Sequence, residues 1–255
     1  MLLARRLGFA VLISIGCAAA PATQGSGGTA GTGGSGGVGG TGTGGSGGAG
    51  GSGGSGVAPG DMIDDLEDGD ASIIRGGRPP RVGAWYTYHD HTAAGAMTYP
   101  TGMAFVPAPG GANGTAFAAR FAGNGFTQWG AGMGFNINDP GDGMGGSMKM
   151  QYDASSFHAV TFYAKATGPM RMRVNFPDKD TDPAGGHCTN CEDDFGADVT
   201  LGTDWQSFTL AFTDLKQIGY GDPVPAFDPA SLYAIHFQVA MMPFDVEVDE
   251  IGFLK

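Results

Sequence analysis

Apolar and polar residues alternate with a period of two through most of the chain beyond residue 60. The clearest case is "MRMRVNF" at 170–176, where Met170, Met172, Val174 and Phe176 occupy every second position. This alternation is typical of a β-strand with one face on a core and the other toward solvent. Strands are predicted on the same grounds at 158–165, 205–212 and 232–240, and from weaker patterns at 115–123, 131–138 and 244–253.

No long stretch shows the 3.6-residue period of a helix. Only "DPASLY" predicts a single helical turn, with Asp228 as its cap and Pro229 at its first position. Gly, Pro, Asp and Asn separate the alternating stretches. Many short strands in about 195 residues favour an all-β fold, an antiparallel β-sandwich that spans 61–255.

The N-terminal 60 residues have a different character. Arg5 and Arg6 precede an apolar run of about ten residues, which is shorter than a membrane-spanning helix of about 20. Residues 1–16 are interpreted as a signal peptide, and Gly16-Cys17-Ala18 resembles a bacterial lipoprotein leader in which Cys17 is lipidated. The alternative is an ordinary secretory signal cut near "AAAPA". Residues 17–60 are rich in Gly, Ser and Thr and predict a disordered tether.

These features predict an exported protein of the cell envelope or outer surface. Its contact with the membrane would be the N-terminal lipid alone, and the protein would be secreted if Cys17 is not modified. The net charge is −12, and all 25 acidic residues follow residue 60. An acidic domain is a poor partner for nucleic acid, whose phosphates need Lys and Arg. Neutral polymers and cations remain compatible partners. We expect a monomer.

The stretch "IDDLEDGD" at 63–70 opens the folded part with five acidic residues. Like charges at this density either stay solvated, as on a protected edge strand, or hold a cation. The last predicted strand changes phase, because Val246 and Val248 share one parity and Ile251 and Phe253 share the other. A β-bulge near Asp249 would produce that change.

Several motifs together resemble a known family. They are "IDDLEDGD", "GAWYTYHD", "VTFYAK…MRMRVNF", "DDFGADVTL…DWQSFTLAFTDL" and "FDVEVDEIGF". Their order is similar to that of the jelly-roll carbohydrate-binding domains of the galactose-binding-like group, with carbohydrate-binding module family 11, which accompanies bacterial β-glucanases, as the nearest type. The resemblance implies that the first and last strands are neighbours and share a structural Ca²⁺. Its implied ligands here are Glu67, Asp70 and Asp249.

The polar sides of three predicted strands suggest where a glycan would bind. If these strands are neighbours, guanidinium, amide and imidazole groups gather on one face and suit paired sugar hydroxyls. The resemblance supports this face through Arg173-x-Asn175. The alternative is an ordinary surface or an internal polar network. The candidate ligand-binding residues are Tyr163, Arg171, Arg173, Asn175, His236 and Gln238, with Trp85, Tyr86, Tyr88 and Trp129 as an aromatic rim.

Two further motifs carry possible chemistry. Cys188 and Cys191 are expected to form a disulfide in an oxidising compartment, and free thiols or a zinc site with His187 are the alternatives. "DKDTDP" at 178–183 alternates acidic residues like a calcium loop, but Pro183 replaces the required glycine. We therefore expect a solvated loop there.

The predicted function is polysaccharide binding, with a β-glucan as the expected ligand. One alternative is a structural or adhesive surface lipoprotein without a glycan ligand. The second is a jelly-roll glycoside hydrolase, because Asp245, Glu247 and Asp249 resemble the acidic strand of laminarinase-type enzymes. That run lies at the C-terminal end of the chain and reverses the usual order of Glu and Asp, so a non-catalytic binding module is favoured.

Overall fold

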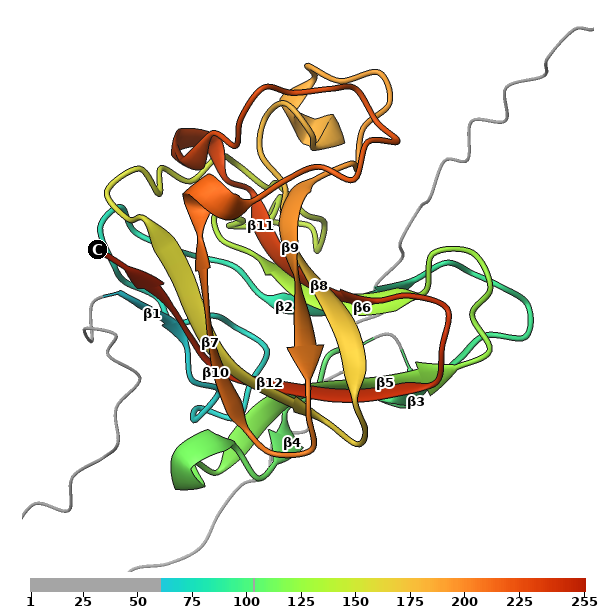
Figure 1. The fold of residues 1–255 in the computed structure, drawn as a ribbon. Coiled ribbons are helices and arrows are strands. Elements are labelled where there is room, and N and C mark those ends of the chain that lie inside the picture. Colours follow the sequence, from blue (N-terminus) through green and yellow to red (C-terminus); the bar gives the residue numbers. More distant parts are fainter. Residues whose placement is uncertain (1–60, 103) are drawn as a thin grey trace, which may run out of the picture. The chain divides into compact units, whose positions relative to one another are not determined.

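The computed structural model describes residues 61–102 and 104–255, and these residues form two stacked antiparallel sheets (Figure 1). The seven-stranded sheet has the order β10-β7-β12-β5-β3, with β1 beside β12 and β4 beside β5. Its strands are β1 (Met62–Asp64), β3 (Ala96–Tyr99), β4 (Ala108–Pro109), β5 (Phe117–Asn124), β7 (Ala159–Ala166), β10 (Gln206–Ala211) and β12 (Phe244–Leu254).

The second sheet has five strands in the order β2-β6-β11-β8-β9. They are β2 (Trp85–His89), β6 (Ala131–Asn136), β8 (Met170–Phe176), β9 (Phe195–Leu201) and β11 (Ala234–Val239). In the part of the chain that the structure describes, four single-turn 3₁₀ helices lie between strands, namely η1 (Ala112–Gly114), η2 (Pro183–Gly185), η3 (Phe212–Asp214) and η4 (Pro229–Ser231). Within the described ranges, no helix has the length and apolar character needed to cross a bilayer.

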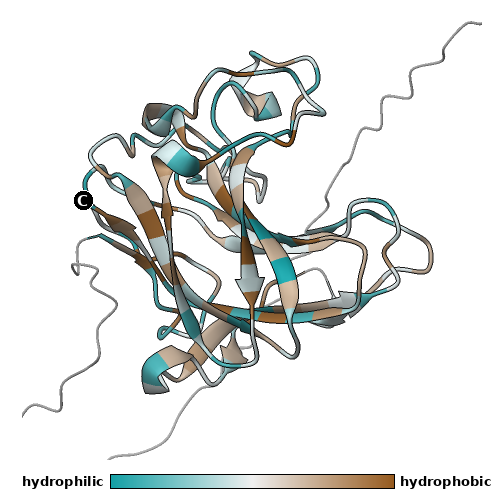
Figure 2. Ribbon diagram, viewed as in Figure 1, coloured by the Kyte–Doolittle hydropathy of each residue, from teal (hydrophilic) through white to brown (hydrophobic). Residues whose placement is uncertain are grey.

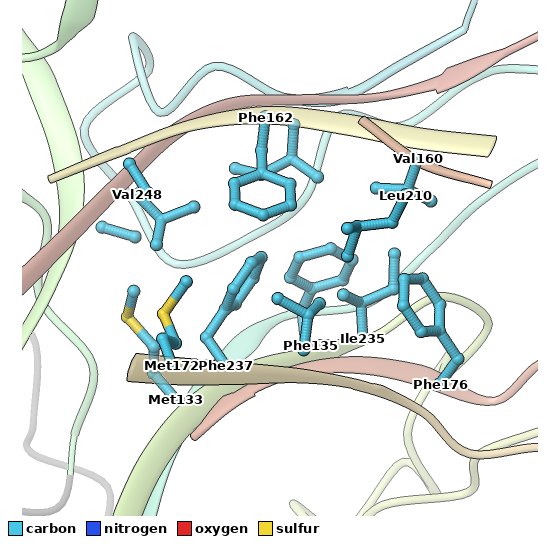
Figure 3. Close-up of a cluster of buried hydrophobic side chains, with 14 of the residues drawn as sticks. Met133, Phe135, Val160, Phe162, Met172, Phe176, Leu210, Ile235, Phe237 and Val248 are labelled. Atoms are coloured by element: carbon cyan, nitrogen blue, oxygen red, sulfur yellow. The ribbon is translucent and has the colours of Figure 1, made fainter. Parts of the chain in front are cut away.

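The core lies between the two sheets, because each strand directs alternate side chains inward. Hydropathy alternates along the strands accordingly (Figure 2). Figure 3 shows the two inner faces meeting in a layer of aromatic, aliphatic and Met side chains. Each large side chain buried there contributes about 1.5–3 kcal/mol. The labelled residues are Val160, Phe162, Leu210 and Val248 from the seven-stranded sheet, and Met133, Phe135, Met172, Phe176, Ile235 and Phe237 from the five-stranded sheet.

Three local predictions are confirmed. The apolar positions of 170–176 are all buried in β8. Asp228 caps η4, accepting the amide of Ala230. The register of β12 against β7 shifts between Asp249 and Gly252, which is the predicted bulge.

The first and last strands are neighbours, because β1 pairs antiparallel with β12. One residue of the acidic opening stretch, Asp64, has a structural role that the sequence did not indicate. Asp64 is fully buried, and its carboxylate accepts the indole N–H of Trp85 at 2.6 Å and the amide of Leu66 at 3.1 Å. The signal peptide, the tether and Cys17 all fall within residues 1–60, outside the described ranges.

Candidate functional site

The outward face of the five-stranded sheet carries two parallel rows of side chains that cross its strands. One row runs Tyr86, Gly134, His236, Asn175 and Gly196, and the next runs Tyr88, Gly132, Gln238, Arg173 and Asp198. Since strand neighbours lie about 4.8 Å apart, each row extends about 19 Å across the sheet. A face of that width matches an extended chain of several sugar rings.

Glycines in β6, the neighbour of the edge strand β2, let two aromatic side chains lie flat on this face. A Cβ at Gly132 would lie 2.5 Å from the Tyr88 ring, and a Cβ at Gly134 would lie 2.5 Å from the His236 ring. The rings of Tyr88 and His236 are 5.3 Å apart, and Tyr86 lies 5.8 Å from His236. The three rings form an aromatic floor over β6.

Hydrogen bonds hold the polar members of the two rows in place. Tyr86 Oη lies 2.6 Å from His236 Nε2. Asn175 donates through Nδ2 to Gln238 Oε1 at 3.1 Å and accepts at Oδ1 from Arg173 Nε at 2.8 Å. These groups are preorganised, which lowers the entropy lost when a ligand binds.

Trp129 stands at one end of the floor. Its ring lies 5.9 Å from that of Tyr88, and 42% of the residue is exposed. The Gln238 amide donates to the Trp129 carbonyl at 3.2 Å, which links the indole's loop to the second row. An exposed indole beside a tyrosine is suited to stacking against the C–H face of a sugar.

Two polar atoms near this floor are buried and have no hydrogen-bond partner among residues 61–102 and 104–255. They are Tyr88 Oη and Asp194 Oδ1. Asp194 immediately precedes β9, and its carbonyl accepts from Arg173 at 3.3 Å. Leaving a buried polar atom unpaired costs about 1–3 kcal/mol, so a ligand that supplies the missing bonds gains that energy.

The protonation states of the floor favour a neutral polar ligand. Burial lowers the pKa of His236 to about 4, so its imidazole is neutral at pH 7. Burial, with the charges near it, raises the pKa of Tyr88 far above its usual range, so the phenol keeps its proton. Burial also raises the pKa of Asp194 to about 7, against a hydrogen bond with Thr181 and with smaller contributions from the carboxylates of Asp182 and Asp178.

Two of the expected ligand-binding residues lie elsewhere. Trp85 is only 4% exposed and packs in the core against Phe105, Phe135 and Phe237, because its parity along β2 is opposite to that of Tyr86. Tyr163 lies on β7 in the seven-stranded sheet, so it does not share a face with Arg173. Of the three strands expected to be neighbours, only β8 and β11 are paired.

Arg171 lies on the same side of β8 as Arg173 but outside the two rows. Its guanidinium donates to Asp198 at 2.8 Å, and the side chain is 73% exposed. Arg171 is therefore an edge residue, whereas Arg173 is held within the face by Asn175 and by the Lys216 carbonyl at 2.5 Å.

Of the three residues expected to bind Ca²⁺, Glu67 and Asp249 contact the same segment of the chain, whereas Asp70 does not. Glu67 accepts the amides of Ala116 and Phe117, and Asp249 accepts the amide of Ala112, so both carboxylates contact the segment that joins β4 to β5. Asp70 is exposed and accepts the amide of Ser72. Among the described residues, no three His, Cys, Asp or Glu side chains form a group that could hold a metal ion.

Cys188 and Cys191 form a disulfide in the loop that follows β8.

The first part of the same loop is more buried than expected. The prediction of a solvated loop at 178–183 is wrong, because Asp178 is fully buried and Asp182 is 4% exposed. Asp178 accepts the amides of Thr181 and Asp228, and Asp182 accepts from Lys149 at 2.5 Å.

The carboxylates of Asp245 and Glu247 on the last strand are half-buried and lie on the outward face of the seven-stranded sheet. Asp245 forms two hydrogen bonds with Arg120, at 2.8 and 2.7 Å, and Glu247 lies 3.0 Å from Lys165 Nζ. Both border a shallow hollow of about 220 Å³ on the seven-stranded sheet. Both are neutralised by cations, an arrangement that does not resemble the acid and nucleophile pair of a glycosidase.

Sequence reasoning missed Asp90 and Asp194 as contributors to the site. Asp90 is the last residue of "GAWYTYHD". Its carboxylate accepts the backbone amides of Gln128, Trp129 and Gly130, which lie 38 to 40 positions further along the chain. Asp194 lies in "DDFGADVTL", and its place in the sequence suggests no role for it. In both cases only the strand pairing brings the partners together.

No family model and no curated protein matches the sequence. Among solved structures, the chain is similar to a family 11 carbohydrate-binding module from Clostridium thermocellum in complex with a β-1,3-1,4-mixed-linked tetrasaccharide. The identity is 17%, the match covers 76% of this chain and 94% of that one, and the TM-score is 0.47. A family 30 module of a cellulosomal cellulase from the same organism gives 17% identity, 76% and 96% coverage and a TM-score of 0.47.

The chain is an antiparallel β-sandwich of jelly-roll type, and family 11 and family 30 carbohydrate-binding modules are among the solved structures similar to it. Identity and TM-score are both low. A function can therefore be inferred only from this chain's own residues.

Proposed function

We propose that the domain binds a polysaccharide across the outward face of the five-stranded sheet. The observation that carries the proposal is the unpartnered, buried Tyr88 Oη beside the aromatic floor of Tyr86, Tyr88 and His236. A sugar ring stacks on the accessible part of such a floor. Because protein atoms cover Tyr88 Oη and Asp194 Oδ1, the sugar hydroxyls reach them through a bridging water or after a side-chain movement.

A β-glucan is the first ligand to test, because the sequence motifs resemble modules that accompany β-glucanases. The fixed donors and acceptors of Arg173, Asn175 and Gln238 select hydroxyl pairs along an extended chain. The face bears a neutral imidazole and neutral phenols, which suits an uncharged polymer.

The test is retention of the full chain on soluble and insoluble β-glucans, xylan, mannan and chitin. Tyr88→Phe removes one hydroxyl with no protein partner. It should therefore weaken retention by about tenfold while leaving the melting temperature unchanged or slightly raised. Tyr152→Phe is the matched control, because Tyr152 Oη donates to the Pro79 carbonyl at 3.2 Å and its residue is 2% exposed. That variant should lose stability and keep its retention.

Equal retention by Tyr88→Phe and the natural chain, or no retention on any polymer, would remove this proposal. The second result would favour the structural or adhesive surface protein. Reducing ends are assayed in the same tubes. Their release would instead support the hydrolase and direct attention to Asp245 and Glu247.

Export and lipid attachment are part of the proposal and are supported by residues 1–18 alone. Metabolic labelling with a fatty-acid analogue should mark the full chain and should fail for Cys17→Ser. Labelling of both would place the lipid elsewhere, and labelling of neither would favour a secreted protein.

A structural Ca²⁺ is proposed near the β1–β12 pair. Its support is that Glu67 and Asp249 both contact the segment between β4 and β5, whose carbonyl oxygens are of the hard type that calcium takes.

A further inference from the structure

The loop after β6 presents three methionines to solvent. Met144, Met148 and Met150 are 89%, 48% and 42% exposed, and none belongs to the hydrophobic core or to the residues packed against it. A single exposed apolar residue is ordinary on a protein surface. Three within seven residues of one loop leave three thioether sulfurs available to a ligand.

Two aspartates fix the backbone of this loop. Asp142 Oδ1 accepts the amides of Met144 and Gly146 at 2.7 and 2.8 Å. Asp139 accepts the amide of Met148 at 2.7 Å and the hydroxyl of Ser147 at 2.5 Å. The methionines are therefore presented from a hydrogen-bonded frame.

Two backbone hydrogen bonds indicate that Met148 and Met150 extend to the same side. The amide of Met148 donates to Asp139 Oδ1, and that of Met150 donates to the Asn138 carbonyl at 2.7 Å. Alternate amides that face one neighbouring segment indicate an extended chain, whose alternate side chains share a side. Lys149, between them, turns away to Asp182.

Met144 lies on the same loop, which is closed by the amide of Asp142 donating to the Gly146 carbonyl at 3.0 Å. Each Met side chain has three rotatable bonds, so the three sulfurs can adapt to one ion. Thioethers are soft, neutral ligands that select soft cations such as Cu(I) over Ca²⁺ or Mg²⁺. The domain's negative charge also attracts a cation.

We propose that Met144, Met148 and Met150 form a binding site for a soft monovalent metal cation, Cu(I) or its redox-inert analogue Ag(I). The loop borders the proposed sugar-binding face, because Asn136 donates to Asp139 and accepts from the Tyr86 hydroxyl. The proposed metal site uses none of that face's side chains. The carboxylates of Asp139 and Asp142 position the loop, since they accept its backbone amides and the hydroxyl of Ser147.

The first test is calorimetric titration of the full chain with Ag(I) in a nitrate buffer without chloride or thiol. It uses a Cys17→Ser background, because the other two cysteines are in the disulfide. One Ag(I) should bind per chain at this site. The triple variant Met144→Leu, Met148→Leu and Met150→Leu should weaken that binding at least tenfold.

The matched control is Met241→Leu with Met242→Leu, which removes two other exposed methionines, 57% and 40% exposed. It should bind Ag(I) as the parent does. Circular dichroism checks that all variants are folded, and Leu preserves the apolar character and nearly the volume of Met. Cu(I), titrated anaerobically against a bicinchoninate competitor, should give the same order of affinities.

Methyl resonances of ¹³C-labelled Met provide a second readout. Those of Met144, Met148 and Met150 should shift with Ag(I), and those of Met241 and Met242 should not. Unchanged Ag(I) affinity in the triple variant, or no shift of the three methyls, would overturn the proposal. Absent Ag(I) binding together with weaker glycan retention by the triple variant would also overturn it, and would make the loop an apolar margin of the sugar face.

Discussion

Asp90 Oδ2 accepts the backbone amide of Trp129 at 3.1 Å, across 39 positions of sequence. The same oxygen accepts the amides of Gln128 at 2.8 Å and Gly130 at 3.1 Å. Burial would raise the pKa of Asp90, but its hydrogen bonds, including those from Thr92, Gln128 and Gly130, outweigh this and hold the pKa well below its usual range. The buried carboxylate thus anchors the loop that presents the exposed indole.

Asp90→Ala should weaken polysaccharide retention by about tenfold and lower the melting temperature, because four backbone amides lose their acceptor and Trp129 loses its anchor. Trp129→Ala should cause a similar loss of retention with little change in melting temperature. The double variant should bind no more weakly than either single variant, since both changes remove the same contact, that of the Trp129 indole with the sugar.

The control for Asp90→Ala is Asp153→Ala, whose exposed carboxylate accepts only from its neighbour Ser155. It should leave both measurements unchanged. Full retention by Asp90→Ala would show that Trp129 does not need the anchor.

Gly132→Ala should destabilise the domain by about 1–3 kcal/mol, because its Cβ would lie 2.5 Å from the Tyr88 ring and 2.6 Å from the Phe237 carbonyl oxygen. Denaturant unfolding measures the loss. The displaced ring should also weaken retention. Gly168→Ala is the control, since a Cβ there meets nothing within 4 Å. If both variants unfold at the same denaturant concentration, the flat placement of Tyr88 is wrong.

Arg173→Ala should lose glycan retention and also about 1–2 kcal/mol of stability, because the guanidinium bonds Asn175 and the Lys216 carbonyl. Arg173→Lys should restore little, since an ammonium lacks the planar fork. Arg171→Ala should change the free energy of unfolding by less than about 0.5 kcal/mol, because its pair with Asp198 is exposed. Equal effects at the two arginines would contradict their different placement.

Stability should depend on pH through Asp64. Burial raises its pKa from 3.8 to about 7, against its hydrogen bonds to Trp85 and Leu66 and with a small contribution from Asp68 and Asp65. Between these two values the folded chain keeps a proton that the unfolded chain has lost. Raising the pH from about 4 to about 7 therefore lowers the contribution of this group to the free energy of unfolding.

Asp64→Asn should remove that contribution, so its free energy of unfolding should fall less steeply than that of the natural chain from pH 4 to 7. Denaturant curves at several pH values measure both slopes. His236, whose pKa is lowered to about 4, acts in the opposite direction and is common to both chains. Identical slopes would show that Asp64 is ionised in the folded state throughout this range.

Chelation should lower the melting temperature if Ca²⁺ binds near β1 and β12, because the ion binds only the folded chain. EDTA followed by excess Ca²⁺, monitored by calorimetry, should lower and then restore the transition. Glu67→Gln should make the transition insensitive to EDTA. A transition that EDTA leaves unchanged in the natural chain would remove the calcium proposal.

The sequence alone determined several of the strands and their inward faces, although it predicted no strand at β2, β3 or β9. Residues 170–176 form a strand with Met170, Met172, Val174 and Phe176 buried, since a period of two is a local property of the backbone. The phase change at Asp249 and the cap at Asp228 were readable for the same reason, because each involves residues adjacent in the chain.

Tertiary structure decided which strands are neighbours, and with them the candidate site. "AWYTYH" carries large aromatic residues at both parities, so only packing placed Trp85 inside and Tyr86 and Tyr88 outside. Tyr163 has the periodicity of a face residue but belongs to the other sheet. Asp90 meets Trp129, and Tyr88 lies flat on Gly132, only because β2 pairs with β6. Strand pairing joins distant residues through backbone groups that every residue carries, so the local pattern of side chains does not specify the partner.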